Sequence, residues 1–331
     1  MSSVWTQFKS FLAARAQARK LMDYPATYKA VAPDSRINQP DVFDPALKHF
    51  RYGFRKGEPT FTDETIARSW WTAQDRATFA VLKTVNSSAW KEHLILRGSA
   101  VVRAWYGNRA RHPRDLDWVV QPATLKMQDA LAKQLVSGVI QAVLSQGVAD
   151  APDQPPIEFE STSVANDEIW NYDRAPGTRV MFPWKSPDLP PGGVQCDLVF
   201  AESLPLPPVL TSFENPIDHD ALQFTTVSKE MSLAWKIKWL HADPYPQGKD
   251  LYDAVLLAED VLPPVHVVRE LINADSKPYY KRHPFVADSV LGWEVDWETF
   301  VLEYPWVKGT AEEWKQRLAD AIRPGFSTSS S

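Results

Sequence analysis

The segment from Leu94 to Val120, LILRGSAVVRAWYGNRARHPRDLDWVV, decides the fold of this chain. Its first residues are a short apolar run that predicts a buried strand. The turn Gly98-Ser99 follows and opens a predicted helix, Ala100–Tyr106. After a basic loop, Leu116–Val120 predicts the next strand. The order of strand, turn, helix and strand indicates a mixed α/β domain.

The Gly98-Ser99 turn is a candidate phosphate site. A strand that enters a helix through Gly-Ser lets the backbone approach a ligand, and the N–H groups and the positive end of the helix dipole face an anion. Arg103 lies four residues after Ser99 and shares its helix face, so it would reach the same phosphates. The alternative is ordinary turn chemistry, which a lone Gly-Ser pair does not exclude.

Asp115 and Asp117 are a candidate metal pair. Alternate residues of a strand share a face, so these two carboxylates point one way while Leu116 points toward a core. Two neighbouring carboxylates repel each other unless a cation such as Mg²⁺ lies between them. The alternative is a polar strand end that pairs with Arg111 or Arg114.

Asp197 is the candidate third carboxylate. It lies inside an apolar run, VQCDLVF from Val194 to Phe200, where an unpaired Asp is costly to bury. Beside Asp115 and Asp117 it would complete a shared set of metal ligands. The alternative is that Asp197 pairs with an arginine.

Lys236, Asp250 and Asp253 form a second candidate group. Lys236 lies on the half-buried side of its predicted helix, and the two aspartates are three residues apart and share a face. A half-buried lysine near two acids is either a structural ion-pair cluster or a phosphate-binding group of an active site. Spacing alone leaves both open.

The bulk composition bounds the class of protein. The chain has 331 residues, of which 44% are hydrophobic, which allows a sizeable core. The formal net charge of −5 means that any surface for nucleic acid must be local. A single cysteine, Cys196, excludes an internal disulfide and a cysteine zinc site and predicts a cytoplasmic protein. No apolar run approaches the ~20 residues of a membrane span, so no membrane partner is expected.

Apolar periodicity predicts the other elements. Helices are expected from Val4 to Met22, over Asp63–Val85, Ala123–Gln146, Lys249–Glu259, Val265–Asn273 and Ala311–Ile322, and after the N-cap Ser228. Strands are expected over Ile157–Ser161, Arg179–Phe182, Val194–Phe200 and Leu222–Val227, with Pro-rich loops at Ser186–Gly193 and Leu204–Pro216. We expect four parts: an N-terminal helix and irregular arm (1–60), an α/β domain (61–226), a helical domain (227–326) and a disordered tail (327–331).

Four short motifs occur in a fixed order: LRGSAVVR (Leu96–Arg103), RHPRDLD (Arg111–Asp117), LAWKIKWL (Leu233–Leu240) and KDLYD (Lys249–Asp253). Together they resemble nucleotidyltransferases of the AbiEii/AbiGii toxin family, within the DNA polymerase β-like superfamily. The family motifs read L-K-G-G-[ST]-x-x-R, R-x-S-x-D-[IL]-D, L-A-x-K-x-x-x-L and K-D-x-Y-D. The resemblance covers roughly residues 60–260 and departs from the family at Pro113 and in an insertion at about 148–190.

The resemblance implies an α/β (α+β) fold, in which a polymerase-β-like mixed sheet is flanked by helices and followed by a C-terminal helical domain. It implies transfer of an NMP group from an NTP to an acceptor such as tRNA, with Mg²⁺ or alternatively Mn²⁺, by a toxin that has a cognate antitoxin. The metal ligands it implies are Asp115, Asp117 and Asp197, and the nucleotide-binding residues are Gly98, Ser99, Arg103 and Lys236. The catalytic residues it implies are Asp115, Asp117, Asp197, Lys236, Asp250 and Asp253.

Two other functions stay open at this point. One is a non-catalytic sensor that binds nucleotide or RNA on the same fold. The other is a nucleotidyltransferase that modifies a small molecule such as an antibiotic. For a nucleic acid acceptor, the segments Phe50–Lys56 and Lys277–His283 interleave aromatic and basic residues, which can stack bases and meet phosphates. The interpretation favoured for each segment alone is a solvated loop anchored by its aromatic residues.

Overall fold

The computed structural model describes residues 27, 34–44, 47, 53–171, 175–275 and 285–327. The predicted N-terminal helix up to Met22, the segment Lys277–His283 and the last four residues of the predicted tail lie outside the described residues. The described chain divides into two compact units, each discontinuous in sequence. The first lies within Met1–Val85 and Lys133–Asp197, and the second lies within Asn86–Ala132 and Leu198–Ser331.

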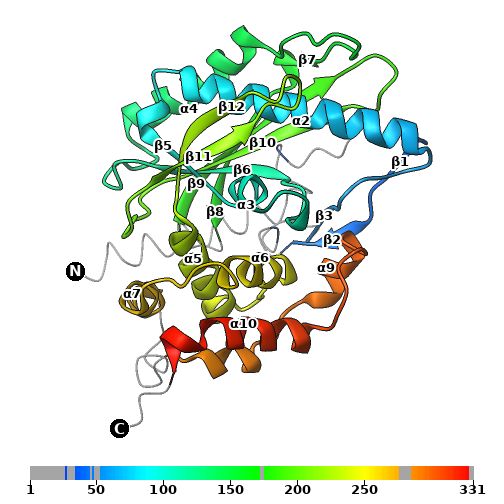
Figure 1. Ribbon diagram of the computed structural model, residues 1–331. Coiled ribbons are helices and arrows are strands. Elements are labelled where there is room, and N and C mark those ends of the chain that lie inside the picture. The colour runs from blue at the N-terminus through cyan, green and yellow to red at the C-terminus, as the bar shows by residue number, and fades with distance from the viewer. Residues whose placement is uncertain are drawn as a thin grey trace. The chain divides into compact units, whose positions relative to one another are not determined.

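The first unit contains most of two long helices and the strands of the insertion (Figure 1). Its helices are α2 (Glu64–Ser87) and α4 (Ala130–Gln146), with a 3-10 turn, η5 (Ser161–Ser163). Its strands are β1 (Ile37–Asn38), β2 (Asp41–Phe43), β3 (Phe54–Lys56), β4 (Thr60–Phe61), β7 (Glu158–Phe159), β8 (Ala165–Asn171), β9 (Ala175–Lys185) and most of β10 (Gly192–Val199).

The core of the first unit is built around Trp184 of β9. This side chain is fully buried, and its ring centroid lies 5.7 Å from that of Trp70 on α2. Its indole Nε1 donates to Oε1 of Gln74 at 2.8 Å, and the Gln74 amide donates to the carbonyl of Gly193 at 3.0 Å. A Cβ atom on Gly192 would collide with the Trp184 ring. The tryptophan therefore fixes α2 against the start of β10.

The second unit contains four strands and the C-terminal helices (Figure 1). Its strands are β5 (Leu94–Arg97), β6 (Asp115–Val120), β11 (Val209–Glu214) and β12 (Ala221–Thr226). Its helices are α3 (Ser99–Tyr106), α5 (Lys229–Ala242), α6 (Gly248–Ala258), α7 (Val265–Asp275), α9 (Trp297–Glu303) and α10 (Ala311–Phe326), with 3-10 turns η3 (Lys91–His93), η4 (Gly107–Arg109) and η6 (Ala287–Gly292).

The main sheet is mixed, with the strand order β11-β12-β5-β6-β10-β9-β7 and with β8 paired to β9. The pair β5 and β6 is antiparallel and aligns Arg97 with Asp117, whereas β12 runs parallel to β5 with Thr226 opposite Leu96. The predicted fold class, a mixed sheet with helices and a helical C-terminal part, is confirmed. The predicted boundary near residue 226 stays a prediction.

The C-terminal helices share one apolar core with β5, β6 and α3. Trp235, Leu240 and Leu257 are among its buried residues. Ser228 begins α5 as predicted, because its side chain accepts a hydrogen bond from the backbone N–H of Met231 at 3.2 Å. This core fixes the helix that carries Lys236 beside the helix that carries Asp250.

Three predicted elements differ from the structure. The helix expected over Ala123–Gln146 begins only at Ala130, because the residues after Pro122 form turns. The stretch Leu204–Pro216 was expected to be a loop, but it contains β11. Strand β8 has no counterpart among the predicted strands, and β9 extends beyond Arg179–Phe182 at both ends.

Candidate functional site

The Gly98-Ser99 turn has the backbone that its sequence predicts. Gly98 has a φ of 83°, in the region that favours glycine, and a Cβ atom there would collide with Oδ2 of Asp117. Ser99 is the first residue of α3 and is buried. Its Oγ has no hydrogen-bond partner among the residues that the structure describes. The turn therefore lies directly against one carboxylate and presents a buried hydroxyl and the start of a helix.

Asp115 and Asp117 lie on β6 with the alternation that the sequence predicts. Both aspartates are partly buried. Leu116, which lies between them, and Trp118, which follows them, are buried, as residues that face a core should be. Two carboxylates of one strand therefore share a face, next to the Gly98 turn.

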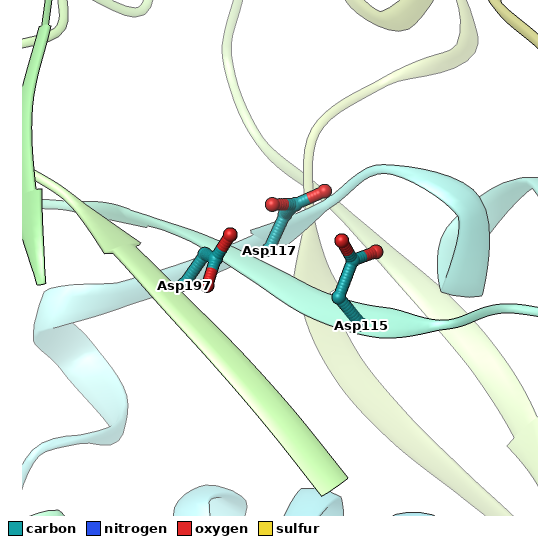
Figure 2. Close-up of side chains that lie close together, drawn as sticks. All are labelled: Asp115, Asp117 and Asp197. Atoms are coloured by element: carbon teal, nitrogen blue, oxygen red, sulfur yellow. The ribbon is translucent and has the colours of Figure 1, made fainter. Parts of the chain in front are cut away.

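Asp197 of β10 lies close to both of these carboxylates (Figure 2). One carboxylate oxygen from each of the three aspartates lies within 4.8 Å of the others. Strand β10 is the neighbour of β6 in the sheet, which explains how a residue so distant in sequence reaches the pair. Carboxylate oxygens are the hard ligands that Mg²⁺ and Mn²⁺ prefer, so this donor set fits a divalent cation.

The arginine partner considered for Asp197 is also present. Arg179 of β9 donates from Nε to Oδ1 at 2.7 Å and from Nη2 to Oδ2 at 2.6 Å, which is a bidentate pair. When the Gln195 amide is turned so that its oxygen faces Arg179, that oxygen accepts from both of these nitrogens at 3.1 Å. Asp197 therefore lies in the group of three carboxylates and also forms an ion pair with Arg179, and its role as a metal ligand stays a prediction.

Lys236, Asp250 and Asp253 meet as a buried cluster. Nζ of Lys236 donates to Oδ1 of Asp250 at 2.6 Å and to Oδ2 of Asp253 at 3.0 Å. Arg111 joins the cluster by donating from Nε and Nη2 to the two oxygens of Asp253 at 3.2 and 3.0 Å. Asp253 is 0% exposed, so its charge is balanced entirely within the protein.

The pKa values of Lys236 and Asp253 both move toward the charged form. Burial alone would lower the pKa of Lys236, but the charges of Asp250 and Asp253 outweigh burial and raise it. Burial would likewise raise the pKa of the Asp253 carboxyl, and Arg111 and Lys236 instead lower it. The cluster is therefore a set of ions, and Lys236 is an ammonium.

Arg103 lies on α3 four residues after Ser99, and its guanidinium contacts the turn that follows the helix. Its guanidinium donates to the carbonyls of Gly107 and Ala110, each at 2.9 Å, and to Oδ1 of Asn108 at 2.8 Å. These contacts hold the turn that follows α3. Binding of a phosphate by Arg103 stays a prediction.

Three arginines of these groups were not among the predicted site residues. Arg111 and Arg179 are the partners of Asp253 and Asp197, and Arg97 is buried between Glu202, at 2.6 Å, and the ring of Trp235. One signal was present for Arg179, because a lone arginine in an apolar run requires a buried acid, and Asp197 stands in another such run. No spacing rule joins Arg111 to Asp253.

The acceptor site stays a prediction. The segment Phe50–Lys56 is described only from Gly53 onward, where Phe54–Lys56 forms β3. The other aromatic and basic segment lies outside the described residues.

Among the described residues, no helix combines the length and the apolar character needed to cross a membrane.

Comparison with known proteins agrees with these motifs. A family model described as "Nucleotidyl transferase AbiEii toxin, Type IV TA system" matches residues 80–319, which is more than two thirds of the chain. The match spans β5, β6, β10, α5 and α6, and so includes every residue of the groups described above. A search among curated proteins found no match.

Proposed function

This chain belongs to the nucleotidyl transferase AbiEii toxin family, and from that premise we propose that it transfers an NMP group from an NTP to tRNA with Mg²⁺. The observation that carries the proposal is the group of three carboxylates within 4.8 Å of one another. Carboxylate oxygens are ligands that Mg²⁺ prefers, and an NTP substrate is normally delivered with Mg²⁺.

Asp115, Asp117 and Asp197 would hold the metal, with Mn²⁺ as an alternative to Mg²⁺. Bound there, the ion would supply the positive charge that offsets the triphosphate. The Gly98-Ser99 turn would bind phosphate through its backbone N–H groups and the buried Ser99 hydroxyl. The backbone of Gly98 packs against Asp117, so a phosphate bound at the turn would lie next to the metal ligands.

The remaining groups supply charge and proton transfer. The acceptor hydroxyl would attack the α-phosphorus of the NTP, and the bond to pyrophosphate would break. Asp197 would help to activate that hydroxyl by accepting its proton. Lys236, which is held by Asp250 and Asp253, would offset the phosphate charge that grows in the transition state.

The family also supports two partners of this reaction. Its description as the toxin of a type IV toxin–antitoxin system supports a cognate antitoxin. For the acceptor, the support is the resemblance of the motifs to a family whose toxins modify tRNA ends. A tRNA acceptor would place the reaction in the cytoplasm.

The proposal is tested by incubating the purified protein with each α-³²P-labelled NTP and total tRNA, with Mg²⁺, Mn²⁺ or EDTA. We expect label on tRNA with a divalent ion and none with EDTA. Asp115→Asn and Asp117→Asn should abolish transfer, whereas Asp320→Asn, an exposed aspartate on α10, should leave it unchanged.

Three outcomes would contradict the proposal. Label on an aminoglycoside added to the same reaction, with none on tRNA, would point to an antibiotic-modifying enzyme. Binding of NTP without transfer to any acceptor would point to a sensor. Undiminished transfer by Asp115→Asn and Asp117→Asn would exclude these two carboxylates from the reaction and so overturn the metal site.

A further inference from the structure

Arg111 is a buried arginine in the loop between α3 and β6. It is 5% exposed, and its guanidinium donates hydrogen bonds to both carboxylate oxygens of Asp253. The two residues are 142 positions apart in sequence. A bidentate arginine pair fixes the plane of the carboxylate as well as its place. Asp253 therefore has one orientation, and Arg111 sets it.

The same carboxylate also holds Lys236. Oδ2 of Asp253 accepts from Nη2 of Arg111 and from Nζ of Lys236, each at 3.0 Å. Any rotation of the Asp253 carboxylate would move the acceptor away from Lys236. The ammonium of Lys236 is thus positioned through Asp253 by a residue that it does not itself contact through a hydrogen bond or ion pair in the described structure.

Arg111 also balances the charge of the buried cluster. Arg111 and Lys236 carry two positive charges, and Asp250 and Asp253 carry two negative charges, so the buried cluster is neutral. Without Arg111, the lysine would face two carboxylates and the cluster would carry a net charge of about −1. An anionic triphosphate would be repelled by such a cluster. With Arg111 present, the charge of Asp253 is divided between two cations.

An ammonium has three donors, and the two carboxylates take two of those of Lys236. We propose that Arg111 is a positioning residue that orients Asp253 and shares its charge, so that Lys236 keeps a donor and a positive field for a phosphate of the NTP. The proposal rests on the proposed function in one respect, namely that Lys236 meets the triphosphate.

The position of Arg111 in the chain strengthens the assignment. It lies four residues before Asp115, so one loop leads from the ion cluster into the strand of the acidic pair. Burial alone would lower the pKa of Arg111, but the charge of Asp253 outweighs it, with further contributions from Tyr304 and Asp115. Arg111 is therefore a permanent cation next to both groups.

The test is a set of charge-matched variants in the full chain. Arg111→Gln should lower kcat/KM for the NTP by about 10-fold to 100-fold, the range expected when a charge-assisted contact is lost. Arg111→Lys keeps the positive charge but loses the two parallel hydrogen bonds of the guanidinium. Its kcat/KM should lie between those of Arg111→Gln and wild type. Arg317→Gln, which removes an exposed arginine of α10 and its ion pair with Glu259 at the end of α6, is the matched control and should stay at the wild-type value.

Two double variants separate positioning from a purely structural role. Arg111→Gln with Asp253→Asn removes one charge of each sign, and should recover part of the NTP affinity lost in Arg111→Gln. In a Lys236→Gln background, Arg111→Gln should cost less than about twofold more, because a residue that acts through Lys236 has nothing left to act on. Circular dichroism and thermal unfolding establish which variants are folded.

NTP affinity is measured separately, by titration with a non-hydrolysable NTP. Additive losses in the Lys236→Gln background, or an Arg111→Lys variant equal to wild type in both affinity and kcat/KM, would overturn the role of Arg111 while leaving the proposed function in place. A wild-type protein that binds the NTP but transfers nothing would overturn the proposed function, and the affinities of the variants would still decide the role of Arg111. A wild-type protein that does not bind the NTP would overturn both.

Discussion

The backbone of Gly98 packs directly on Asp117, so that a Cβ atom on the glycine would lie 3.2 Å from Cβ of the aspartate and collide with its Oδ2. The same glycine has a φ of 83°, which a residue with a side chain rarely adopts. The Gly98-Ser99 turn and the strand that carries Asp117 therefore constrain each other.

Gly98→Ala should abolish NTP binding as well as transfer. The side chain would displace the Asp117 carboxylate and add backbone strain of about 1–3 kcal/mol. Gly107→Ala is the matched control, because Gly107 has a φ of 55° but nothing within 4 Å of the added Cβ. It should lose stability in urea unfolding and still bind the NTP. Equal binding by Gly98→Ala and wild type would contradict the close packing of the turn.

Arg179→Met should destabilise the protein far more than Lys185→Met on the same strand. Arg179 pairs with the buried Asp197, and removal of one partner of a buried pair costs about 3–5 kcal/mol. Lys185 pairs with Glu158 at 3.3 Å where both side chains are exposed, and such pairs contribute about 0–1 kcal/mol. The free energies of unfolding in urea decide the comparison.

The double variant Arg179→Met with Asp197→Leu should recover most of this loss, because no buried charge is left unpaired. If the double variant is as unstable as Arg179→Met alone, packing of the arginine stem, and not its charge, stabilises this part of the sheet.

His241 should make the protein less stable in mild acid. Burial lowers the pKa of His241 below its usual 6.5, so the folded protein binds this proton less readily than the unfolded chain. The contribution of His241 is fully present above pH 6.5 and is lost as the pH falls through the lower folded value. The midpoint of thermal unfolding, measured from pH 7.5 to pH 5, should therefore fall.

His241→Gln should flatten this pH profile, whereas His266→Gln, an exposed histidine on α7, should leave it as in wild type. A profile that is unchanged in His241→Gln would assign the acid sensitivity to other groups.

Arg76→Met should open the start of the insertion to proteases. The buried guanidinium of Arg76 on α2 donates to the carbonyls of Pro155 at 2.8 Å and Ala149 at 3.1 Å. Loss of these charge-assisted bonds should raise the rate of cleavage between residues 147 and 157 by about 10-fold or more. Lys83→Met, an exposed site on the same helix, is the control, and equal cleavage in both variants would contradict the role of Arg76.

Local patterns predict the elements near Gly98 because local physics forms them. Alternation in a strand is sufficient to place Asp115 and Asp117 on one face, and the Gly-Ser pair is sufficient to start α3. Strand β11 was not predicted, because the two prolines directly before it, Pro207 and Pro208, indicate a loop. It forms the edge of the sheet, where a strand tolerates prolines beside it.

Partners of opposite charge are harder to predict than the elements that carry them. The sequence predicts a buried side for Lys236 and a shared face for Asp250 and Asp253, and the structure brings the three together. It does not predict Arg111 as the fourth member, since helix and strand periods describe one element and not which distant loop meets it. The arginine partner of Asp197 was foreseen as a type of residue and not as Arg179.

Because Arg111 and Asp253 are 142 positions apart in sequence, the ribosome makes Arg111 well before it makes Asp253. A ribosome that adds about 5–20 residues per second needs roughly 7–28 s to pass from one partner to the other. The ion cluster around Lys236 is incomplete in every nascent chain of that interval and in every fragment that ends before residue 253. A cell that makes this protein therefore carries unfinished copies that lack the cluster, and an interrupted message yields fragments without it.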